Sequence, residues 1–266
     1  MVEVLKAFKK SQGDQDNAAP VEKADSDSGN RSVNVSRAGW VSPNYAKSRI
    51  VSLDMRVVEA NRCLGLLADV EEIEHFKLLR TQISQQMEDK GWNTLMVTSV
   101  RPGEGKTLTA INLAAMFARE YVKTVILVDA DLQKQSIHKY LGYEQEVGLV
   151  AHLLENVPME DIIVWPKIEK LTIISGGRTV KESAELLTSP RMRALLQEMK
   201  SRYADRYLFF DVPSLSRSAD AFSFAPLVDA ILVVVEAGKT PMPEIQKALA
   251  RLPQEKVLGL VMNRME

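Results

Sequence analysis

The stretch LMVTSVRPGEGKTLTAINLAAMFA, residues Leu95–Ala118, decides the fold of this chain. Its first residues, Leu95–Thr98, have the apolar composition of a buried strand, and a loop over Arg101–Thr107 separates them from a segment with helical apolar spacing. Gly103 and Gly105 allow backbone N–H groups to curve around an anion. The helix that follows directs the positive end of its dipole at the same point. The stretch therefore predicts a phosphate-binding loop between a strand and a helix.

Within this loop, two side chains have the chemistry that phosphate binding requires. Lys106 can reach the β- and γ-phosphates of a nucleotide, and the Thr107 hydroxyl can bind Mg²⁺. The strict pattern G-x-x-x-x-G-K-[ST] has glycine where this chain has Val100, so the generic motif is incomplete. A glycine turn beside a surface lysine is the structural alternative, but the strand before and the helix after favour phosphate binding. The residues expected to bind the nucleotide here are Pro102, Gly103, Glu104, Gly105, Lys106, Thr107 and Leu108.

Two further apolar strands end in aspartates. Val125–Val128 is followed by Asp129 and Asp131, and Tyr207–Phe210 is followed by Asp211. Each aspartate alone could be a helix cap or a turn residue, but ligands of open α/β sheets bind at the C-terminal ends of the strands. Beside a phosphate-binding loop, these carboxylates are suited to Mg²⁺ coordination and to positioning a nucleophile. The residues expected in catalysis are Lys106, Asp129 and Asp131, and those expected to hold Mg²⁺ are Thr107, Asp131 and Asp211.

The remaining chain continues the alternation of apolar strands and helices. Further strands are expected at Leu171–Ile174, Ala230–Val235 and Val257–Met262, and helices near Leu186–Tyr203 and Pro243–Leu252. Continuous apolar strands that alternate with helices indicate the α/β class. With the phosphate loop, the pattern predicts a three-layer P-loop NTPase fold, in which helices cover both faces of a mostly parallel sheet.

Composition divides the chain into three segments. Residues 1–48 are rich in Ser, Asp, Asn and Gly and predict a disordered N-terminal arm. Residues 49–69 have scattered apolar side chains and are expected to pack as a connecting segment on the main domain. Residues 70–266 form the predicted nucleotide-binding domain, which begins with an amphipathic helix.

Overall composition excludes several classes of protein. The chain has 266 residues, with 34 Lys and Arg against 35 Asp and Glu, a net charge of −1 that argues against a nucleic-acid partner. Its single cysteine excludes an internal disulfide and fits a reducing cytoplasm. No stretch approaches the ~20 consecutive apolar residues of a membrane span, so no transmembrane segment is expected.

Three motifs carry a resemblance to a known family. PGEGKT (102–107), ILVDADL (126–132) and FFDVP (209–213) resemble the Walker A, A′ and B motifs of bacterial tyrosine kinases, the BY-kinase (CpsD/CapB) family, which are relatives of the ParA/MinD ATPases. ELLTSP (185–190) resembles a further family element, and the long N-terminal arm is similar to the subgroup associated with exosortase-type exopolysaccharide loci. The resemblance implies that residues 70–266 are an ATP-binding kinase domain with ATP as substrate and Mg²⁺ as cofactor.

The resemblance also implies partners and a location. Glu74, Lys77 and Arg80 are similar to the family's E-x-x-R-x-x-R helix, which contacts a neighbouring subunit, with Lys77 in place of the first arginine. A homo-oligomer is therefore expected. Asn263, directly after the last strand, is a candidate contact for the adenine edge or a loop-start cap. The family further implies a separate membrane polysaccharide co-polymerase as activator, a role in exopolysaccharide or capsule export, and a cytoplasmic protein recruited to the inner face of the membrane.

The sequence departs from the family pattern at several positions. Gln133 stands where family members have arginine, and Ser214 replaces the second proline of D-x-P-P. The chain reaches Glu266 without a tyrosine-rich tail, so autophosphorylation of such a tail is expected to be excluded. Two alternatives to a tyrosine kinase stay open: a ParA/MinD-type ATPase without kinase activity, and a catalytically degenerate interaction protein. Arg101, where the positioning ATPases have lysine, favours the kinase group.

Overall fold

One sheet carries the fold of the residues that the computed structural model describes, which are 3–5, 48–67, 71–120, 123–145, 147–202 and 206–265. Across these residues it has nine strands in the order β1-β9-β8-β3-β7-β4-β6-β5-β2. The strands are β1 (Glu3–Leu5), β2 (Arg49–Ile50), β3 (Thr94–Ser99), β4 (Thr124–Asp129), β5 (Ile163–Trp165), β6 (Leu171–Ile174), β7 (Arg206–Asp211), β8 (Ala230–Glu236) and β9 (Val257–Asn263). Neighbours from β9 to β6 run parallel, whereas β1 is antiparallel to β9 and β5 is antiparallel to β6.

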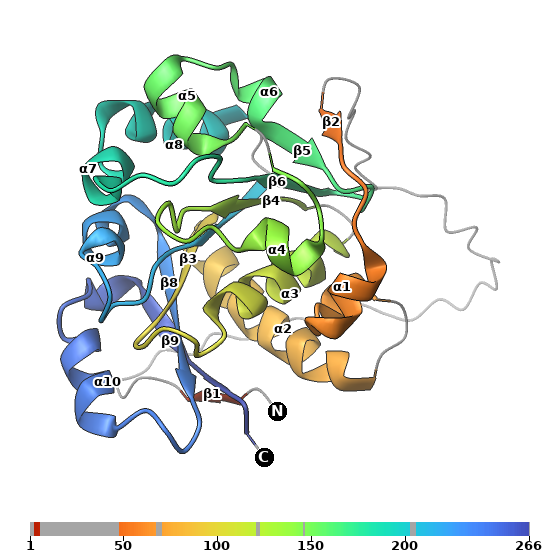
Figure 1. The fold of residues 1–266 in the computed structure, drawn as a ribbon. Coiled ribbons are helices and arrows are strands. Elements are labelled where there is room, and N and C mark those ends of the chain that lie inside the picture. The colour runs from red at the N-terminus through yellow and green to blue at the C-terminus, as the bar shows by residue number, and fades with distance from the viewer. Residues whose placement is uncertain are drawn as a thin grey trace, which may run out of the picture.

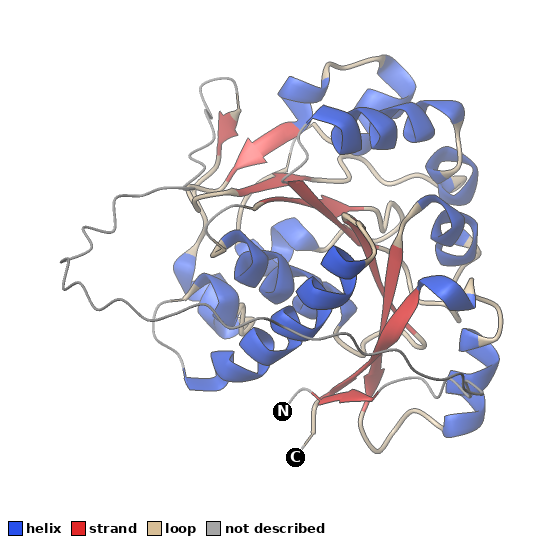
Figure 2. Cartoon of the chain, turned by 180° about the vertical axis from the view of Figure 1, so that it is seen from behind, coloured by secondary structure: helices blue, strands red, loops and turns tan. Residues whose placement is uncertain are grey.

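Helices cover both faces of this sheet (Figure 1; Figure 2 shows the opposite side). On one face lie α1 (Met55–Ala60), α2 (Glu74–Asp89), α3 (Lys106–Ala118) and α4 (Ile137–Leu141), with the 3-10 helices η1 (Leu64–Leu66) and η2 (Glu71–Ile73). On the other lie α5 (Leu149–Glu155), α6 (Met159–Ile162), α7 (Ser183–Leu187), α8 (Pro190–Arg202), α9 (Asp220–Phe224) and α10 (Met242–Leu249), with η3 (Ala225–Leu227). η4 (Gln254–Lys256) leads into β9. The expected three-layer fold with a mostly parallel sheet is confirmed.

The central strands divide their side chains between two apolar cores. In β3, Leu95 and Val97 pack in the core shared with α2 and α3, whereas Met96 packs in the core of the other face. This division follows from the two-residue period of a strand. Because both faces are covered, every residue of β3 and β4 is buried, which explains their continuous apolar sequence.

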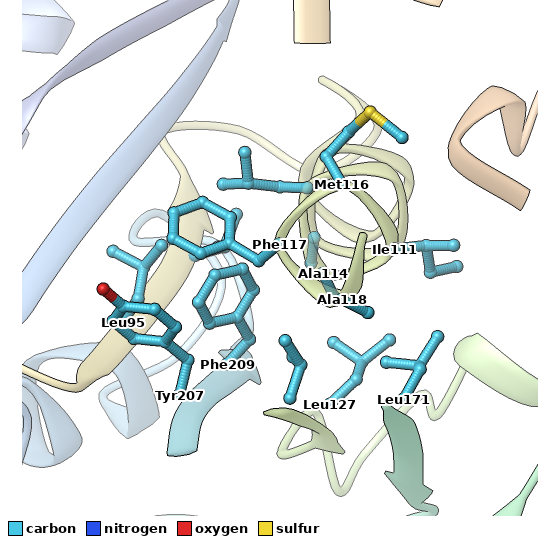
Figure 3. Packing of buried hydrophobic residues seen from close by; sticks show 14 of the residues in the cluster. Leu95, Ile111, Ala114, Met116, Phe117, Ala118, Leu127, Leu171, Tyr207 and Phe209 are labelled. Atoms are coloured by element: carbon cyan, nitrogen blue, oxygen red, sulfur yellow. The ribbon is translucent and has the colours of Figure 1, made fainter. Parts of the chain in front are cut away.

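Helix α3 lies at the centre of the first core (Figure 3). The Phe117 ring meets the rings of Tyr207 and Phe209 edge-to-face, with both pairs of centroids 5.0 Å apart. Eleven of the thirteen residues of α3 are buried. This packing holds the first turn of α3, and with it the phosphate loop, against β3 and β7.

The elements expected from the sequence are present, with one change and several additions. The helix expected near Leu186–Tyr203 is two helices, α7 and α8, because Pro190 has no N–H to continue a helix from the preceding turn. The short strands β2 and β5 were not predicted, since two or three residues carry too little periodicity to be recognised. No helix in the described ranges combines the length and the apolar character needed to cross a bilayer.

The N-terminal part of the chain contributes two segments to the described structure. Residues 3–5, which the sequence analysis placed within a disordered arm, form strand β1 beside β9, and the rest of the arm before residue 48 lies outside the described residues. In the connecting segment, Val58 and Cys63 are fully buried, and the N–H of Gly65 donates to Asn112 Oδ1 on α3 at 2.9 Å. The described part of this segment therefore lies against α3.

Candidate nucleotide-binding site

The loop between β3 and α3 has the backbone shape of an anion cradle. Gly103 and Gly105 have φ of +87° and +97°, which residues with a Cβ rarely adopt. A Cβ on Gly105 would also clash with Asn263 Nδ2, so a larger residue would displace the Asn263 side chain. The N–H groups of the first turn of α3 have no partner within the helix. Within the described structure, the N–H groups of residues 103–107 donate to no backbone acceptor. These N–H groups are free to bind an anion.

Lys106 and Thr107 meet two strand-end aspartates beside this cradle. Lys106 Nζ lies 3.0 Å from Asp211 Oδ1 and 3.1 Å from Asp131 Oδ2. Thr107 Oγ1 donates to Asp211 Oδ2 at 2.6 Å. All four side chains are buried or nearly so, with Asp211 at 0% and Lys106 at 13% exposure. The structure thus brings together the lysine, threonine and aspartates that the sequence analysis grouped.

Asp129 lies at the same edge of the sheet, held by backbone donors. It is opposite Asp211 in the register of β4 and β7. Its Oδ2 accepts from the N–H groups of Ser136 and Ile137 at 2.9 and 3.0 Å. Its Oδ1 accepts from the N–H of Asp131 at 3.3 Å. The start of α4 therefore fixes the orientation of this carboxyl group.

Burial and neighbouring charge shift the proton equilibria of this group of residues. Burial, together with the negative charge of Asp211, raises the pKa of Asp129 to about 7. Burial lowers the pKa of Lys106, but the charges of Asp211 and Asp131 outweigh it, so this pKa lies above the ordinary value for lysine. Lys106 is therefore a cation, while Asp129 titrates near neutral pH and can accept a proton.

The donor set also fits a divalent cation. The Lys106 ammonium occupies the position of a cation between Asp131 and Asp211. In the described residues, no group of three or more His, Cys, Asp or Glu side chains is arranged to hold a metal alone. Mg²⁺ in nucleotide sites is held by one or two carboxylates and completes its shell with phosphate oxygens and water. The Thr107 hydroxyl and the two carboxylates match that need.

A cavity of about 460 Å³ adjoins the loop. Gly105, Leu108 and Asn263 line it on the loop side, and Tyr140 and His75 contribute from α4 and α2. It lies next to the cradle at the C-terminal edge of the sheet, the edge at which ligands of open α/β sheets bind. A second cavity of about 330 Å³, near Trp92, lies at the opposite edge of the sheet, far from the cradle.

Two residues expected to bind nucleotide, Asn263 and Glu104, also make hydrogen bonds that hold the loop. Asn263 Nδ2 donates to the main-chain oxygen of Glu104 at 2.9 Å, so Asn263 braces the loop as well as lining the cavity. The Glu104 side chain is 2% exposed and accepts from the Arg101 N–H at 2.7 Å and from the Thr240 hydroxyl. Pro102 is exposed at the tip of the loop.

The three residues expected at a subunit contact lie on α2. Glu74 and Lys77 are exposed and form an ion pair at 2.5 Å. Arg80 instead turns toward the C-terminal end of α3, where it donates to the Met116 main-chain oxygen at 3.4 Å and lies 3.6 Å from a Glu120 oxygen. The outer face of α2 therefore presents Glu74 and Lys77, and Arg80 is tied to α3.

Sequence reasoning missed the residues that shape the site from a distance. Ser136 directly precedes α4 and donates its N–H to Asp129, a backbone contact that no local sequence pattern indicates. Thr240, in the segment after β8, contacts Glu104, and Glu244 on α10 contacts Arg101; neither contact has a local sequence signal. Gln133, where the family pattern has arginine, donates to Ser183 Oγ at 2.9 Å.

The fold and this site define a P-loop nucleotide-binding protein, and comparison with known proteins gives its family. A family model described as an AAA domain matches residues 93–252. The tyrosine-protein kinase YwqD of Bacillus subtilis is 35% identical over 192 residues, which cover 71% of this chain and 80% of YwqD. The chain therefore belongs to the bacterial tyrosine-protein kinase (BY-kinase) family.

Longer relatives and a solved structure agree with this assignment. The succinoglycan biosynthesis transport protein ExoP of Rhizobium meliloti is 32% identical over 196 residues; these cover 72% of this chain but only 25% of ExoP. The kinase domain of the Escherichia coli tyrosine kinase ETK superposes with a TM-score of 0.66 at 27% identity, covering 73% of this chain and 77% of that domain. The chain thus spans about a quarter of the length of ExoP and most of the ETK kinase domain.

Proposed function

We propose that this protein is an ATP- and Mg²⁺-dependent protein-tyrosine kinase that regulates exopolysaccharide or capsule biosynthesis and export. The observation that carries the proposal is the convergence of Lys106, Thr107 and three strand-end aspartates at one free anion cradle. The proposal is supported by relatives named tyrosine-protein kinase YwqD and succinoglycan biosynthesis transport protein ExoP.

Each residue has a role that its position supports. The cradle N–H groups and Lys106 bind the phosphates, and Lys106 compensates the charge that develops on the transferred group. Thr107, Asp131 and Asp211 would hold Mg²⁺, which when bound neutralises phosphate charge. Asp129, with a pKa raised to about 7 by burial and by Asp211, accepts the proton of the tyrosine hydroxyl.

The proposed partners follow from the same family. A membrane polysaccharide co-polymerase on a separate chain would activate the kinase and recruit it from the cytoplasm to the inner face of the membrane. The exposed Glu74 and Lys77 on α2 would contact a second copy in a homo-oligomer. Nucleic acid is not a proposed partner, because the net charge is −1.

Removal of the Lys106 ammonium tests the proposed activity. The parent should transfer phosphate from Mg²⁺-ATP to tyrosine, and Lys106→Ala should lose at least 100-fold in rate, in keeping with the loss of a preorganised charge at a transition state. The measurement is mass spectrometry of phosphotyrosine after incubation with ATP, alone and with the cytoplasmic tail of a candidate co-polymerase.

A matched control and a second readout separate the outcomes. Lys181→Ala removes an exposed lysine and should leave phosphorylation at the parent level. ATP hydrolysis by the parent without phosphotyrosine on any acceptor would contradict the kinase assignment and favour an ATPase. Equal nucleotide turnover by the parent and Lys106→Ala would contradict the assignment of the site itself.

A further inference from the structure

Glu104 places a carboxylate inside a loop whose backbone is free to bind an anion. An exposed carboxylate there would repel phosphate oxygens across a few ångströms. The side chain is instead 2% exposed, and both of its oxygens have hydrogen-bond donors. Oε2 accepts from the Arg101 N–H at 2.7 Å, across the base of the loop, and Oε1 accepts from the Thr240 hydroxyl. The carboxylate is therefore satisfied by protein groups.

Thr240 connects the loop to a rigid part of the fold. It lies directly after β8, which pairs with β3 on one side and β9 on the other. Its hydroxyl oxygen also accepts from the Glu236 N–H at 3.2 Å, so its own position is tied to the end of β8. The contact between Glu104 and Thr240 thus joins the phosphate loop to the sheet.

A second contact reinforces the first but is weaker. The Arg101 guanidinium donates to both carboxylate oxygens of Glu244 on α10, with Nε 2.7 Å from Oε2. Both side chains are more than 40% exposed, so solvent screens this pair. The hydrogen bonds of buried Glu104 are not screened in this way, and losing a donor would leave a charged oxygen unsatisfied.

We propose that Glu104 and Thr240 are positioning residues that hold the phosphate loop in its nucleotide-binding conformation. Glu104 acts through its bonds to Arg101 and Thr240, and Thr240 acts through Glu104. The consequence for nucleotide rests on the proposed function, since it takes ATP to be the ligand of the cradle. The restraint on the loop itself is a property of the nucleotide-free protein.

We call this restraint of the phosphate loop by Glu104 and Thr240 the brace. Three substitutions and a control test it in the full chain. Thr240→Val removes the hydroxyl and keeps the side-chain shape, Thr240→Ser keeps the hydroxyl, and Glu104→Ala removes the carboxylate. Thr172→Val is the control, because this half-buried threonine in β6 also has a hydrogen-bonded hydroxyl but lies outside the loop. Three quantities are measured: the Kd of a fluorescent ATP analogue with Mg²⁺, hydrogen exchange of the Arg101 amide without nucleotide, and Tm. The Arg101 N–H is the amide that Glu104 holds in a hydrogen bond.

Thr240→Val and Glu104→Ala should each raise the Kd about tenfold or more, as the loss of a hydrogen bond to a buried charged group implies. Both should exchange the Arg101 amide faster than the parent, because its hydrogen bond to Glu104 is lost or loosened. In kinase assays the KM for ATP should rise more than kcat falls, because the reacting groups are intact. Thr240→Ser and Thr172→Val should match the parent in Kd and in exchange.

The readouts keep the brace distinct from the proposed function. Parent-like exchange of the Arg101 amide in Thr240→Val would overturn the brace, as would equal loss of affinity in Thr240→Val and Thr240→Ser. If the parent bound no Mg²⁺-ATP, the proposed function would fail, and faster exchange in Thr240→Val would still support the brace. If Glu104→Ala does not fold, as its Tm would show, Thr240→Val decides the result.

Discussion

At the scale of single residues, the most distinctive electrostatic feature is Asp129. Burial and the charge of Asp211 raise its pKa to about 7 in the folded protein, against about 3.9 in an unfolded chain. As pH rises from about 4 to 7, the Asp129 carboxyl loses its proton in the unfolded chain but keeps it in the folded protein. Its contribution therefore lowers the free energy of unfolding as pH rises over this range. Asp129→Asn cannot ionise and should gain stability relative to the parent over this range.

Urea unfolding at several pH values, without nucleotide, measures this effect at Asp129. The difference in unfolding free energy between Asp129→Asn and the parent should grow in favour of the variant from pH 5 to pH 7. Asp161→Asn, at an exposed carboxyl on α6, should show no such trend. A difference between Asp129→Asn and the parent that stays constant with pH would contradict the assignment.

At the scale of elements, α3 joins the core to the phosphate loop. Phe117 is fully buried and meets the rings of Tyr207 and Phe209 (Figure 3). Phe117→Ala should lower the free energy of unfolding by about 3–5 kcal/mol, through lost burial and the cavity left behind. Leu78→Ala on α2, where the side chain is 63% exposed, should change it by at most about 0.5 kcal/mol. Equal costs in denaturant unfolding would show that Phe117 is not a core residue.

At the scale of the whole molecule, the proposed homo-oligomer has its contact on α2. Glu74 and Lys77 are exposed on α2, which lies on the same face of the sheet as α3. Charge exchange in the double variant Glu74→Lys with Lys77→Glu keeps the pair within the helix but reverses what a neighbouring copy would contact. Self-association should weaken about tenfold, which corresponds to about 1.4 kcal/mol.

Sedimentation equilibrium measures self-association of the parent and the α2 double variant. Lys181→Glu reverses an exposed charge away from α2 and serves as the control. Parent-like association of the double variant would exclude this face of α2 from the contact between copies.

Much of the fold was predictable because its signals are local in the sequence. Strands buried on both faces must be apolar throughout, which identified β3, β4, β6, β7, β8 and β9. The short strands β2 and β5 form only because β6 offers an edge on which β5 pairs, and β2 then pairs with β5. Pairing of this kind depends on a partner distant in sequence, so no local pattern encodes it.

The sequence by itself determined that Lys106, Thr107, Asp129, Asp131 and Asp211 lie at one edge of the sheet, because they follow parallel strands whose C-terminal ends meet there. Only the tertiary structure decided how they are held. The Lys106 ammonium lies between two carboxylates, and the start of α4 orients Asp129. Thr240 receives its role from the pairing of β8 with β3, which brings it to Glu104 across 136 positions of sequence. A hydrogen bond over that separation has no spacing that a sequence pattern can show.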